Sequence, residues 1–403
     1  MTIAHPIARA WLTTGGTAAQ NYDEFADDAE ITEIIAANPF SALAIEMPHR
    51  APESVGTPFA DALPAAAERL RGAREDGHYA RFDEVAVVYR ITGTDGTAGY
   101  GLWCMVETDQ ISTSADEPGL IIRNEDVFLE KVRERVALAE AIGHLLSPVL
   151  LMATDAPERL QEALAEAAAS LGDAQVADVD PSGRTHEIWP VPAGELRDRL
   201  LELAGSGELV VADGNHRSLA AQTAGFGRFL AVVTTPASVA IEPYNRLVTQ
   251  VDGDAGELAA RLNAGGAVVE ALATPPAVPT EAGTVHLYAG GSAWAVRLPR
   301  DPDRDQVDNL DHALVERVIL GDGLGLAAGD KRITYVGGDY DADWLVGEVD
   351  AGRAALAILI APVTVEDFVA VNLNRQKLPR KSTWFTPKAR AGLVVAEIEA
   401  SSD

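Results

Sequence analysis

The feature of this sequence that most constrains its fold is an alternation of strand-like and helix-like segments between residues 149 and 234. The expected elements are a strand at 149–153, a helix at 156–171, a strand at 185–191, a helix at 193–204, a strand at 208–212, a helix at 215–223 and a strand at 228–234. Such an alternation is typical of an α/β core, in which helices cover the faces of a sheet.

Segments on both sides of this core extend the prediction to a mixed α/β (α+β) chain. A strand is expected at 40–48, a helix at 60–75, a hairpin at 83–107 and a helix at 125–146. After residue 250 the composition changes, and a small hairpin is expected at 284–298. We therefore predict an N-terminal α/β lobe (1–120), an α/β core (121–250) and a C-terminal lobe (251–403), with strand-rich additions to the core at both ends.

The charge of the chain limits the ligands that it can take. Lys and Arg number 32 against 61 Asp and Glu, which gives a formal net charge of −29. Such a surface repels phosphate backbones, so nucleic acid is not an expected partner. Any anionic ligand needs a local basic pocket.

Targeting signals and disulfides are not expected either. The N-terminus lacks a basic region followed by an apolar run, and no apolar stretch reaches membrane-spanning length, so we expect a cytoplasmic protein without a membrane partner. Cys104 is the one cysteine, which excludes an intrachain disulfide. It lies in an apolar, strand-like run, where a buried thiol is expected rather than a nucleophile.

The first candidate site is the sequence Asp213-Gly214-Asn215-His216-Arg217, which follows an apolar strand. Gly214 allows a sharp turn, and a helix that starts near Asn215 would present backbone N–H groups and a positive dipole end. His216 and Arg217 add donors and charge, and Asp213 could bind magnesium or accept a proton. The structural alternative is an N-cap aspartate beside a surface His-Arg pair.

The second candidate is Arg123-Asn124-Glu125, with Lys131 and Arg135 further along the same expected helix. Glu125 lies near the expected helix start, and Lys131 and Arg135 share a face through their i, i+4 spacing. The alternative is an ordinary charged helix face.

The third candidate is the basic segment 374–388, which holds Lys381, Ser382 and Thr383 in an otherwise acidic chain. An ammonium group and two hydroxyls suit phosphate oxygens, although the glycines of a P-loop are missing. The alternative is a basic tail segment that neutralises the acidic surface of the protein itself.

Together these segments resemble domain-of-unknown-function family 1015. Residues 210–217 look like its central A-D-G-H-H-R signature, and residues 378–388 look like its terminal P-x-K-S-T-x-F-x-P-K motif. Arg123-Asn124-Glu125 resembles its H-E-x-T helix start, and Asn38-Pro39-Phe40 resembles its N-terminal strand.

The resemblance implies a ParB/sulfiredoxin-like core around the Asp213–Arg217 loop, because free-serine kinases of that fold carry a similar element near nucleotide phosphates. It implies a phosphotransferase that uses ATP or ADP with Mg²⁺ on a small hydroxy amino acid such as serine or a similar metabolite. The chain departs from the family where Asn124, Asn215 and Asn245 stand in place of histidine. Asparagine keeps hydrogen bonding but cannot shuttle a proton.

The expected site therefore combines catalytic, phosphate-binding and metal-binding roles. Asp213, Glu125 and His216 are the expected catalytic residues, and Asp213 is the expected metal ligand. The expected phosphate- or substrate-binding residues are Asn124, Lys131, Arg135, Gly214, Asn215, Arg217, Asn245, Arg246, Lys381, Ser382 and Thr383. The alternatives are a hydrolase or lyase acting on an anionic metabolite and a non-catalytic nucleotide- or metabolite-binding protein.

Overall fold

The computed structural model describes residues 2–17, 20–22, 25, 28–112, 119–125, 127–253, 255–273 and 275–399. Contacts within the chain define two compact units. Unit 1 comprises residues 1–240 and 387–403, and unit 2 comprises residues 241–386. The division into lobes at 120 and 250 stays a prediction, and each unit is described by itself below.

Unit 1 is built on a 13-stranded sheet with the order β5-β6-β11-β8-β12-β4-β3-β2-β21-β7, to which β1, β9 and β10 are joined at the side. Its strands are β1 (Ala4–His5), β2 (Ile7–Thr13), β3 (Tyr79–Thr92), β4 (Ala98–Glu107), β5 (Ile111–Ser112), β6 (Ile121–Arg123), β7 (His144–Leu145), β8 (Val149–Ala153), β9 (Val176–Val179), β10 (Thr185–Val191), β11 (Leu209–Asp213), β12 (Arg228–Thr234) and β21 (Val394–Glu397). Strand β8 is completely apolar and completely buried, as expected for a strand covered on both faces.

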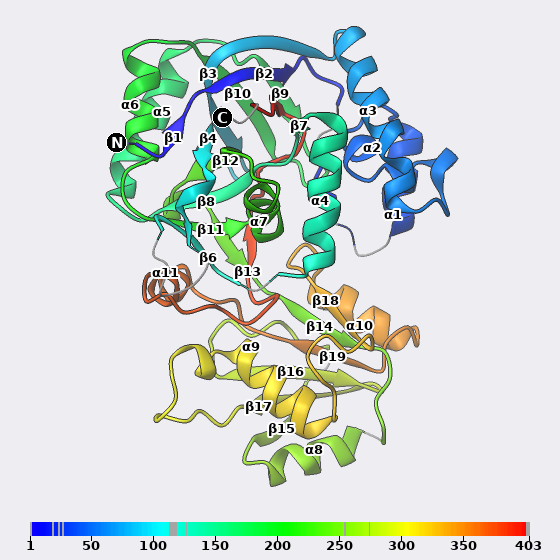
Figure 1. Cartoon of the computed structure of the whole chain (residues 1–403). Coiled ribbons are helices and arrows are strands. Elements are labelled where there is room, and N and C mark those ends of the chain that lie inside the picture. Colours follow the sequence, from blue (N-terminus) through cyan, green and yellow to red (C-terminus); the bar gives the residue numbers. More distant parts are fainter. Residues whose placement is uncertain are drawn as a thin grey trace. The chain divides into compact units, whose positions relative to one another are not determined.

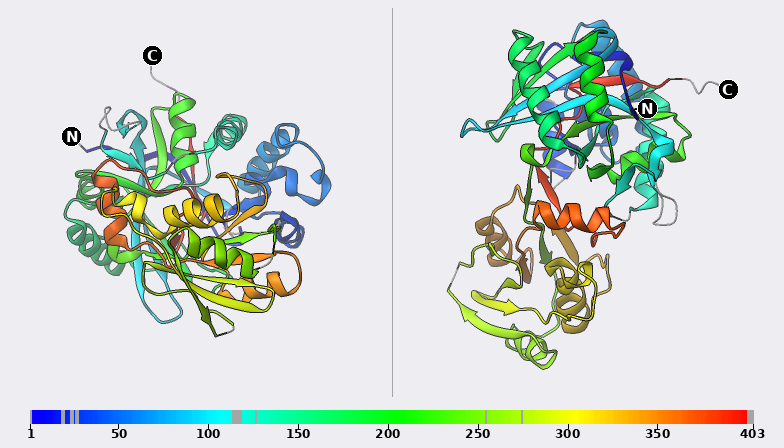
Figure 2. Two further views of the ribbon diagram at one scale, coloured as in Figure 1. Left: turned by 90° about the horizontal axis from the view of Figure 1, so that it is seen from below. Right: turned by 90° about the vertical axis from the view of Figure 1, so that its left-hand side faces the viewer.

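The helices of unit 1 lie on both sides of these strands. They are α1 (Asp28–Ala37), α2 (Ala42–Glu46), α3 (Phe59–Glu75), α4 (Leu129–Ile142), α5 (Pro157–Ser170), α6 (Glu195–Ala204) and α7 (Asn215–Thr223). The α5–α6 pair lies on one side and α3 and α4 lie on the other (Figure 1), and the right-hand view of Figure 2 shows the green α5–α6 pair over the strands. Apolar residues at helical spacing on α5, such as Leu160, Ala163, Leu164 and Ala167, pack into the main core with alternate residues of β3, β4, β8, β11 and β12.

Unit 2 contains a six-stranded sheet with the order β15-β17-β16-β19-β14-β18. Its strands are β14 (Asn245–Val248), β15 (Val268–Leu272), β16 (Thr284–Ala289), β17 (Ser292–Arg297), β18 (Ile333–Val336) and β19 (Leu356–Leu359), and its helices are α8 (Ala255–Ala264), α9 (Asp311–Leu314), the π-helix η7 (Val315–Gly323), α10 (Ala342–Asp350) and α11 (Val365–Leu373). One core contains residues of α8, α9 and η7, and a second core contains residues of α10. A short strand pair, β13 (Ala240–Glu242) with β20 (Trp384–Thr386), lies where the chain passes between the units.

The mixed α/β fold class is confirmed, but the expected strand at 40–48 is wrong. That segment forms helix α2, and Asn38-Pro39-Phe40 lies in the turn before it rather than in a strand. The Ser41 hydroxyl accepts a hydrogen bond from the Leu43 N–H and so caps the helix. Every residue of α2 is buried, so its sequence shows neither helical nor strand periodicity. The ParB/sulfiredoxin-like assignment of the core stays a prediction.

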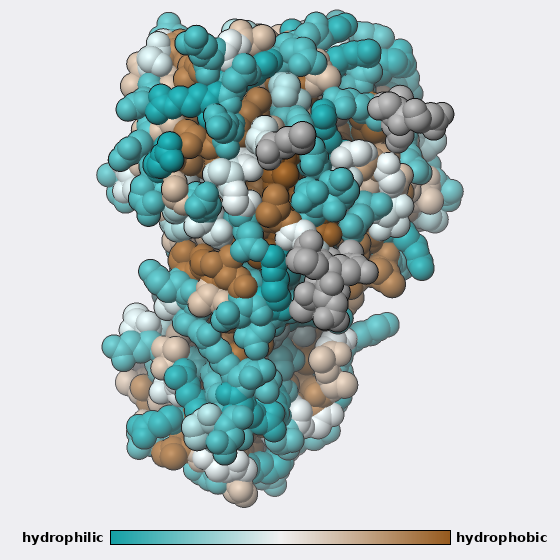
Figure 3. Space-filling view, turned by 60° about the vertical axis from the view of Figure 1, so that its left-hand side comes forward, coloured by the Kyte–Doolittle hydropathy of each residue, from teal (hydrophilic) through white to brown (hydrophobic). Residues whose placement is uncertain are grey.

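Hydrophilic residues cover most of the face shown in Figure 3, as expected for a chain with 23% charged residues. In the part of the chain that the structure describes, no helix combines the length and hydrophobicity needed to cross a membrane.

Candidate functional site

Two of the three candidate motifs meet at one edge of the unit 1 sheet. Strands β6 and β11 are parallel neighbours, with Val211 opposite Arg123. Asn124 follows β6, and Gly214 and Asn215 follow β11. Because the carboxyl ends of parallel strands lie at the same edge, segments far apart in the sequence come together there.

Gly214 makes the turn from β11 into α7. Its φ of +96° lies in the left-handed region, which residues with a side chain rarely adopt. A Cβ at this position would lie 3.2 Å from Cα of Val149 and 2.9 Å from Nε of Arg217. The strand–glycine–helix prediction is therefore confirmed, and the turn requires glycine for both its conformation and its space.

The interpretation of Asp213 as an N-cap is wrong. Gly214 occupies the cap position, and it has no side chain that could cap α7. Asp213 Oδ2 instead accepts a hydrogen bond from Arg217 Nη2 at 2.7 Å, one helical turn further along the chain. The ion pair is only partly exposed, at 25% for the Asp213 side chain and 11% for that of Arg217, so it orients the guanidinium firmly beside the helix start.

Asn124 and Asn215 join the two strand ends directly. Nδ2 of Asn215 donates to Oδ1 of Asn124 at 2.5 Å, and both residues are buried. Oδ1 of Asn215 has no donor among the described residues. This oxygen is an acceptor, so it suits a hydroxyl or ammonium group rather than a phosphate oxygen. Phosphate binding by Asn124 and Asn215 stays a prediction, and the Oδ1 atom of Asn215 does not support it.

His216 is oriented by the segment that precedes α4. Its Nε2 accepts the backbone N–H of Phe128 at 3.0 Å, and the two rings stack with an interplanar angle of 11°. An accepting Nε2 carries no proton, so the proton of the neutral imidazole is on Nδ1. In this arrangement Nε2 of His216 cannot accept a substrate proton.

The expected helix that begins at Glu125 is shorter than predicted. Helix α4 begins at Leu129, so Glu125 lies in the connection between β6 and α4 rather than in the first helical turn. Glu125 is half-buried next to Asn124 in the chain. Lys131 is exposed, whereas Arg135, one turn further along α4, is half-buried.

Arg135 and Arg217 both line a pocket inside unit 1. The Arg135 guanidinium carbon lies 4.6 Å from the ring centre of Tyr22 and 5.5 Å from that of Phe59, which are cation–π distances. The walls of the pocket are mainly apolar and come from α4, α7 and the strands β7, β8 and β12. The carboxylate of Glu46 lines the same pocket, so its charged side chains are two guanidinium groups and one carboxylate among mainly apolar walls.

The remaining predicted residues lie in unit 2. Asn245 and Arg246 begin β14, and Oδ1 of Asn245 accepts the Ile360 N–H at 3.0 Å. Lys381, Ser382 and Thr383 lie in the loop before β20. Ser382 is buried and donates its hydroxyl proton to the Pro379 carbonyl at 2.7 Å, so this hydroxyl supports the loop.

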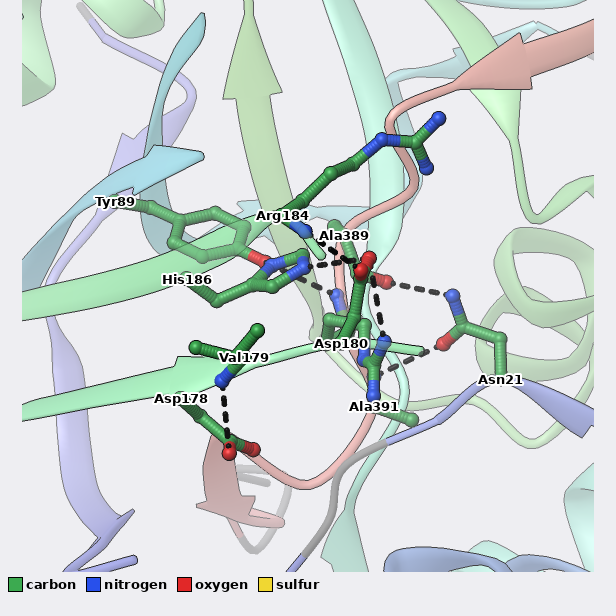
Figure 4. Close-up of polar contacts among 10 residues, drawn as sticks. Asn21, Tyr89, Asp178, Val179, Asp180, Arg184, His186, Ala389 and Ala391 are labelled. Carbon is green, nitrogen blue, oxygen red and sulfur yellow. Dashed lines mark hydrogen bonds and ion pairs between the residues drawn. The ribbon is translucent and has the colours of Figure 1, made fainter. Parts of the chain in front are cut away.

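A buried polar cluster in unit 1 was not singled out from the sequence (Figure 4). Nδ1 of His186 accepts from the Tyr89 hydroxyl at 2.5 Å, and Nε2 donates to Asp180 at 3.1 Å. Burial lowers the pKa of His186, although Asp180 opposes this effect. Nearby, Asn21 makes hydrogen bonds with the backbone of residues 389 and 391. Both ring nitrogens of His186 have partners within the protein, so we interpret the cluster as structural. No sequence signal identifies this cluster, because a single histidine in a strand pattern does not reveal its partners.

The described residues contain no group of three or more His, Cys, Asp or Glu side chains arranged to hold a metal ion. A protein-only metal cage is therefore not formed in this part of the chain. Asp213 still offers a second carboxylate oxygen, Oδ1, because Arg217 engages Oδ2.

The solved structures similar to this chain share little of its sequence. A free serine kinase variant in complex with AMP has 14% identity and a TM-score of 0.41, over 72% of this chain and 92% of that chain. A conserved hypothetical protein from Pyrococcus furiosus has 14% identity and a TM-score of 0.39, over 72% and 93%. SbnI with a C-terminal truncation from Staphylococcus aureus has 11% identity and a TM-score of 0.41, over 72% and 87%.

No curated protein matches the chain. The family described as "Protein of unknown function (DUF1015)" matches residues 12–313, well over half of the sequence. This match agrees with the motifs at Asp213–Arg217 and Arg123–Glu125, which lie inside it, and the chain belongs to this family.

Proposed function

We propose that the protein is a nucleotide-dependent phosphotransferase that acts on a small hydroxy amino acid such as serine or on a similar metabolite. The observation that carries the proposal is the start of α7, where the cap residue Gly214 has no side chain and which lies at the shared carboxyl edge of β6 and β11. Helix starts at such an edge bind anions through backbone N–H groups and the helix dipole. Arg217, held by Asp213, adds a directed guanidinium at the same place.

Phosphoryl transfer depends mainly on positioning and on charge neutralisation, and the site supplies both. Gly214 allows the phosphate to approach the backbone, and Arg217 grips its oxygens. His216 is not assigned as the base, because its Nε2 accepts the Phe128 N–H. The orphaned Oδ1 of Asn215 accepts from the hydroxyl or ammonium group of the acceptor substrate.

Acid–base and metal roles are assigned to the two carboxylates. Glu125 follows β6 at the same sheet edge and is our candidate base for the acceptor hydroxyl. Magnesium in proteins is commonly held by one or two carboxylates together with substrate phosphates and water, and Asp213 Oδ1 fits that pattern. Bound Mg²⁺ would neutralise charge on the phosphate oxygens.

The similar solved structures include free serine kinase in complex with AMP and with ADP. The proposal rests on the site geometry and not on these structures, whose TM-scores lie near 0.4. They name the nucleotides to be tried first.

The test is calorimetric titration of the full chain with ATP and with ADP, each with Mg²⁺, followed by phosphorus NMR of mixtures that contain L-serine. Arg217→Met is expected to weaken nucleotide binding at least about tenfold, because a hydrogen bond to a charged group contributes about 1.5–3 kcal/mol. Arg71→Met is the matched control, since Arg71 pairs with Glu68 and Glu75 on the exposed face of α3. If neither nucleotide binds to the unmodified chain, the proposal is wrong.

One observation favours a second candidate, a non-catalytic nucleotide- or metabolite-binding protein. Asn124 and Asn215 bond to each other, and His216 Nε2 is occupied, so these three side chains supply no proton acceptor. Binding without turnover in the wild type, together with turnover in Asn215→His, would identify this case.

A further inference from the structure

The pocket of unit 1 has apolar walls that a ligand would have to match. Its volume, counted with its opening to solvent, is about 540 Å³, which lies within the range of small-molecule sites. Helices α4 and α7, which lie side by side, form two of its walls (Figure 1). The apolar lining residues include Val136 and Ile142 of α4, Ala221 of α7, and Phe229 and Leu230 of β12. A ligand that fills this space is therefore expected to carry an apolar group.

The guanidinium of Arg135, on the α4 wall, has no carboxylate partner among the residues that the structure describes. Its Nη2 donates only to the Met47 sulfur at 3.9 Å, which is a weak acceptor, and its Nη1 is buried without an acceptor in the same part of the chain. The rings of Tyr22 and Phe59 contact the guanidinium through their π-systems. Because a guanidinium can only donate, and a buried donor without an acceptor is costly, Arg135 suits a ligand that brings a carboxylate.

The pocket also contains one carboxylate, that of Glu46 at the end of α2. Glu46 has other interactions within the protein, but a carboxylate offers about four acceptor positions, and an ammonium contact needs only one of them. Arg217 lines the pocket as well, and its guanidinium pairs with Asp213. The pocket therefore presents both signs of charge, which suits a zwitterion better than a ligand that carries a net charge.

The two remaining polar residues of the pocket differ in what they can offer a ligand. Nε2 of His144 accepts from Arg74 Nη1 at 3.0 Å, and Nδ1 donates to the Ile142 carbonyl at 2.7 Å, so both ring nitrogens are used within the protein. The Ser147 hydroxyl is buried and has no hydrogen-bond partner among the described residues. A hydroxyl can donate or accept, so that of Ser147 can complete the hydrogen bonding of either charged group of a zwitterion.

We propose that this pocket binds an α-amino acid with an apolar side chain, of about the size of leucine. The carboxylate of the ligand pairs with Arg135, its ammonium group contacts Glu46, and its side chain lies against the apolar residues of α4, α7 and β12. Serine is the informative comparison, because its side chain has no apolar group that could fill the space between these walls. The inference goes beyond the phosphotransferase proposed above, since this binding requires no nucleotide.

The test is calorimetric titration of the full chain, without nucleotide, with L-leucine, L-serine and 4-methylpentanoate. The last compound keeps the aliphatic chain and the carboxylate of leucine but lacks the ammonium group. Leucine is expected to bind saturably and at least about tenfold more tightly than either comparison compound. The physical reason is that serine loses the apolar burial and 4-methylpentanoate loses the charge-assisted contact with Glu46.

Substitutions on α4 test the position of the ligand. Arg135→Met removes the guanidinium and should weaken leucine binding about tenfold or more, whereas Arg133→Met, at an exposed arginine of the same helix, should leave it unchanged. Ala139→Leu adds bulk inside the pocket without changing its charge and should also weaken leucine binding. Ala141→Leu, at an exposed position of the helix, is its matched control. The Ala139 variant keeps the test informative if Arg135→Met fails to fold.

Weaker leucine binding in the folded pocket variants, with both controls unchanged, would support the site. Absence of saturable leucine binding, equal affinity for leucine and serine, or unchanged affinity in a folded pocket variant would overturn the proposal. Equal affinity for leucine and 4-methylpentanoate would overturn the assignment of a zwitterion. Failure of nucleotide binding would leave this result standing, because the titrations contain no nucleotide and Arg135 has no part in the phosphotransferase site proposed above.

Discussion

Acidification should destabilise the protein through His312, by an amount that can be worked out from its burial. The pKa of this imidazole falls from 6.5 to about 3 on folding, first because it is buried and second because Arg246 is close. The folded pKa lies below the unfolded pKa, so the unfolded state binds more protons. The contribution of neutral His312 to the free energy of unfolding is fully present above about pH 6.5 and is lost as the pH falls towards 3.

The size of this loss follows from proton linkage. Each unit of pKa shift corresponds to about 1.4 kcal/mol, so the full shift corresponds to about 5 kcal/mol. At about pH 5 the unfolded imidazole is almost fully protonated and the folded one is not, which gives a loss of about 2 kcal/mol relative to about pH 7.5. His144 and His186, whose pKa values burial also lowers, add losses of the same sign.

The assay is urea unfolding near those two pH values, in buffers without phosphate, for the wild type and His312→Gln. Between these two pH values the free energy of unfolding of the variant should fall by about 2 kcal/mol less than that of the wild type, because glutamine does not titrate. His286→Gln is the matched control, since His286 is a partly exposed histidine of the same unit. If the wild type and His312→Gln lose equal stability on acidification, the assignment of a buried, neutral imidazole at position 312 is refuted.

Substitutions at two glycines and one leucine, and labelling of the one cysteine, test other parts of the structure. Gly214→Ala should lower the free energy of unfolding in urea by about 1–3 kcal/mol, because the φ of +96° and the nearby Arg217 disfavour a Cβ. Gly72→Ala, in open space on α3, should instead raise it by about 0.5–1 kcal/mol. Leu151→Ala in the fully buried strand β8 should cost about 2–5 kcal/mol by the same measurement. Burial raises the pKa of Cys104 to about 12, so a thiol reagent should label it only after denaturation; rapid labelling of the folded chain would contradict its burial.

Local chemistry was enough to predict parts of the fold. Strand β10 and helix α7 lie where the pattern places them, because their apolar spacing and flanking turn residues act within a few residues of each other. Segment 40–48 shows the limit of this reasoning, since every residue of α2 is buried and its periodicity is erased. Helix α4 begins later than predicted, and Glu125 therefore lies outside it.

For the candidate site, the sequence by itself determined the glycine turn at Gly214 and the cationic residues that follow it. Only the tertiary structure decided that Asp213 pairs with Arg217 instead of capping α7, and that Asn124 bonds to Asn215. It also decided that Arg246 and His312 are buried together. The physical reason is that local propensity acts within a turn or two of the chain, whereas partner choice and desolvation depend on residues that only the folded sheet brings together.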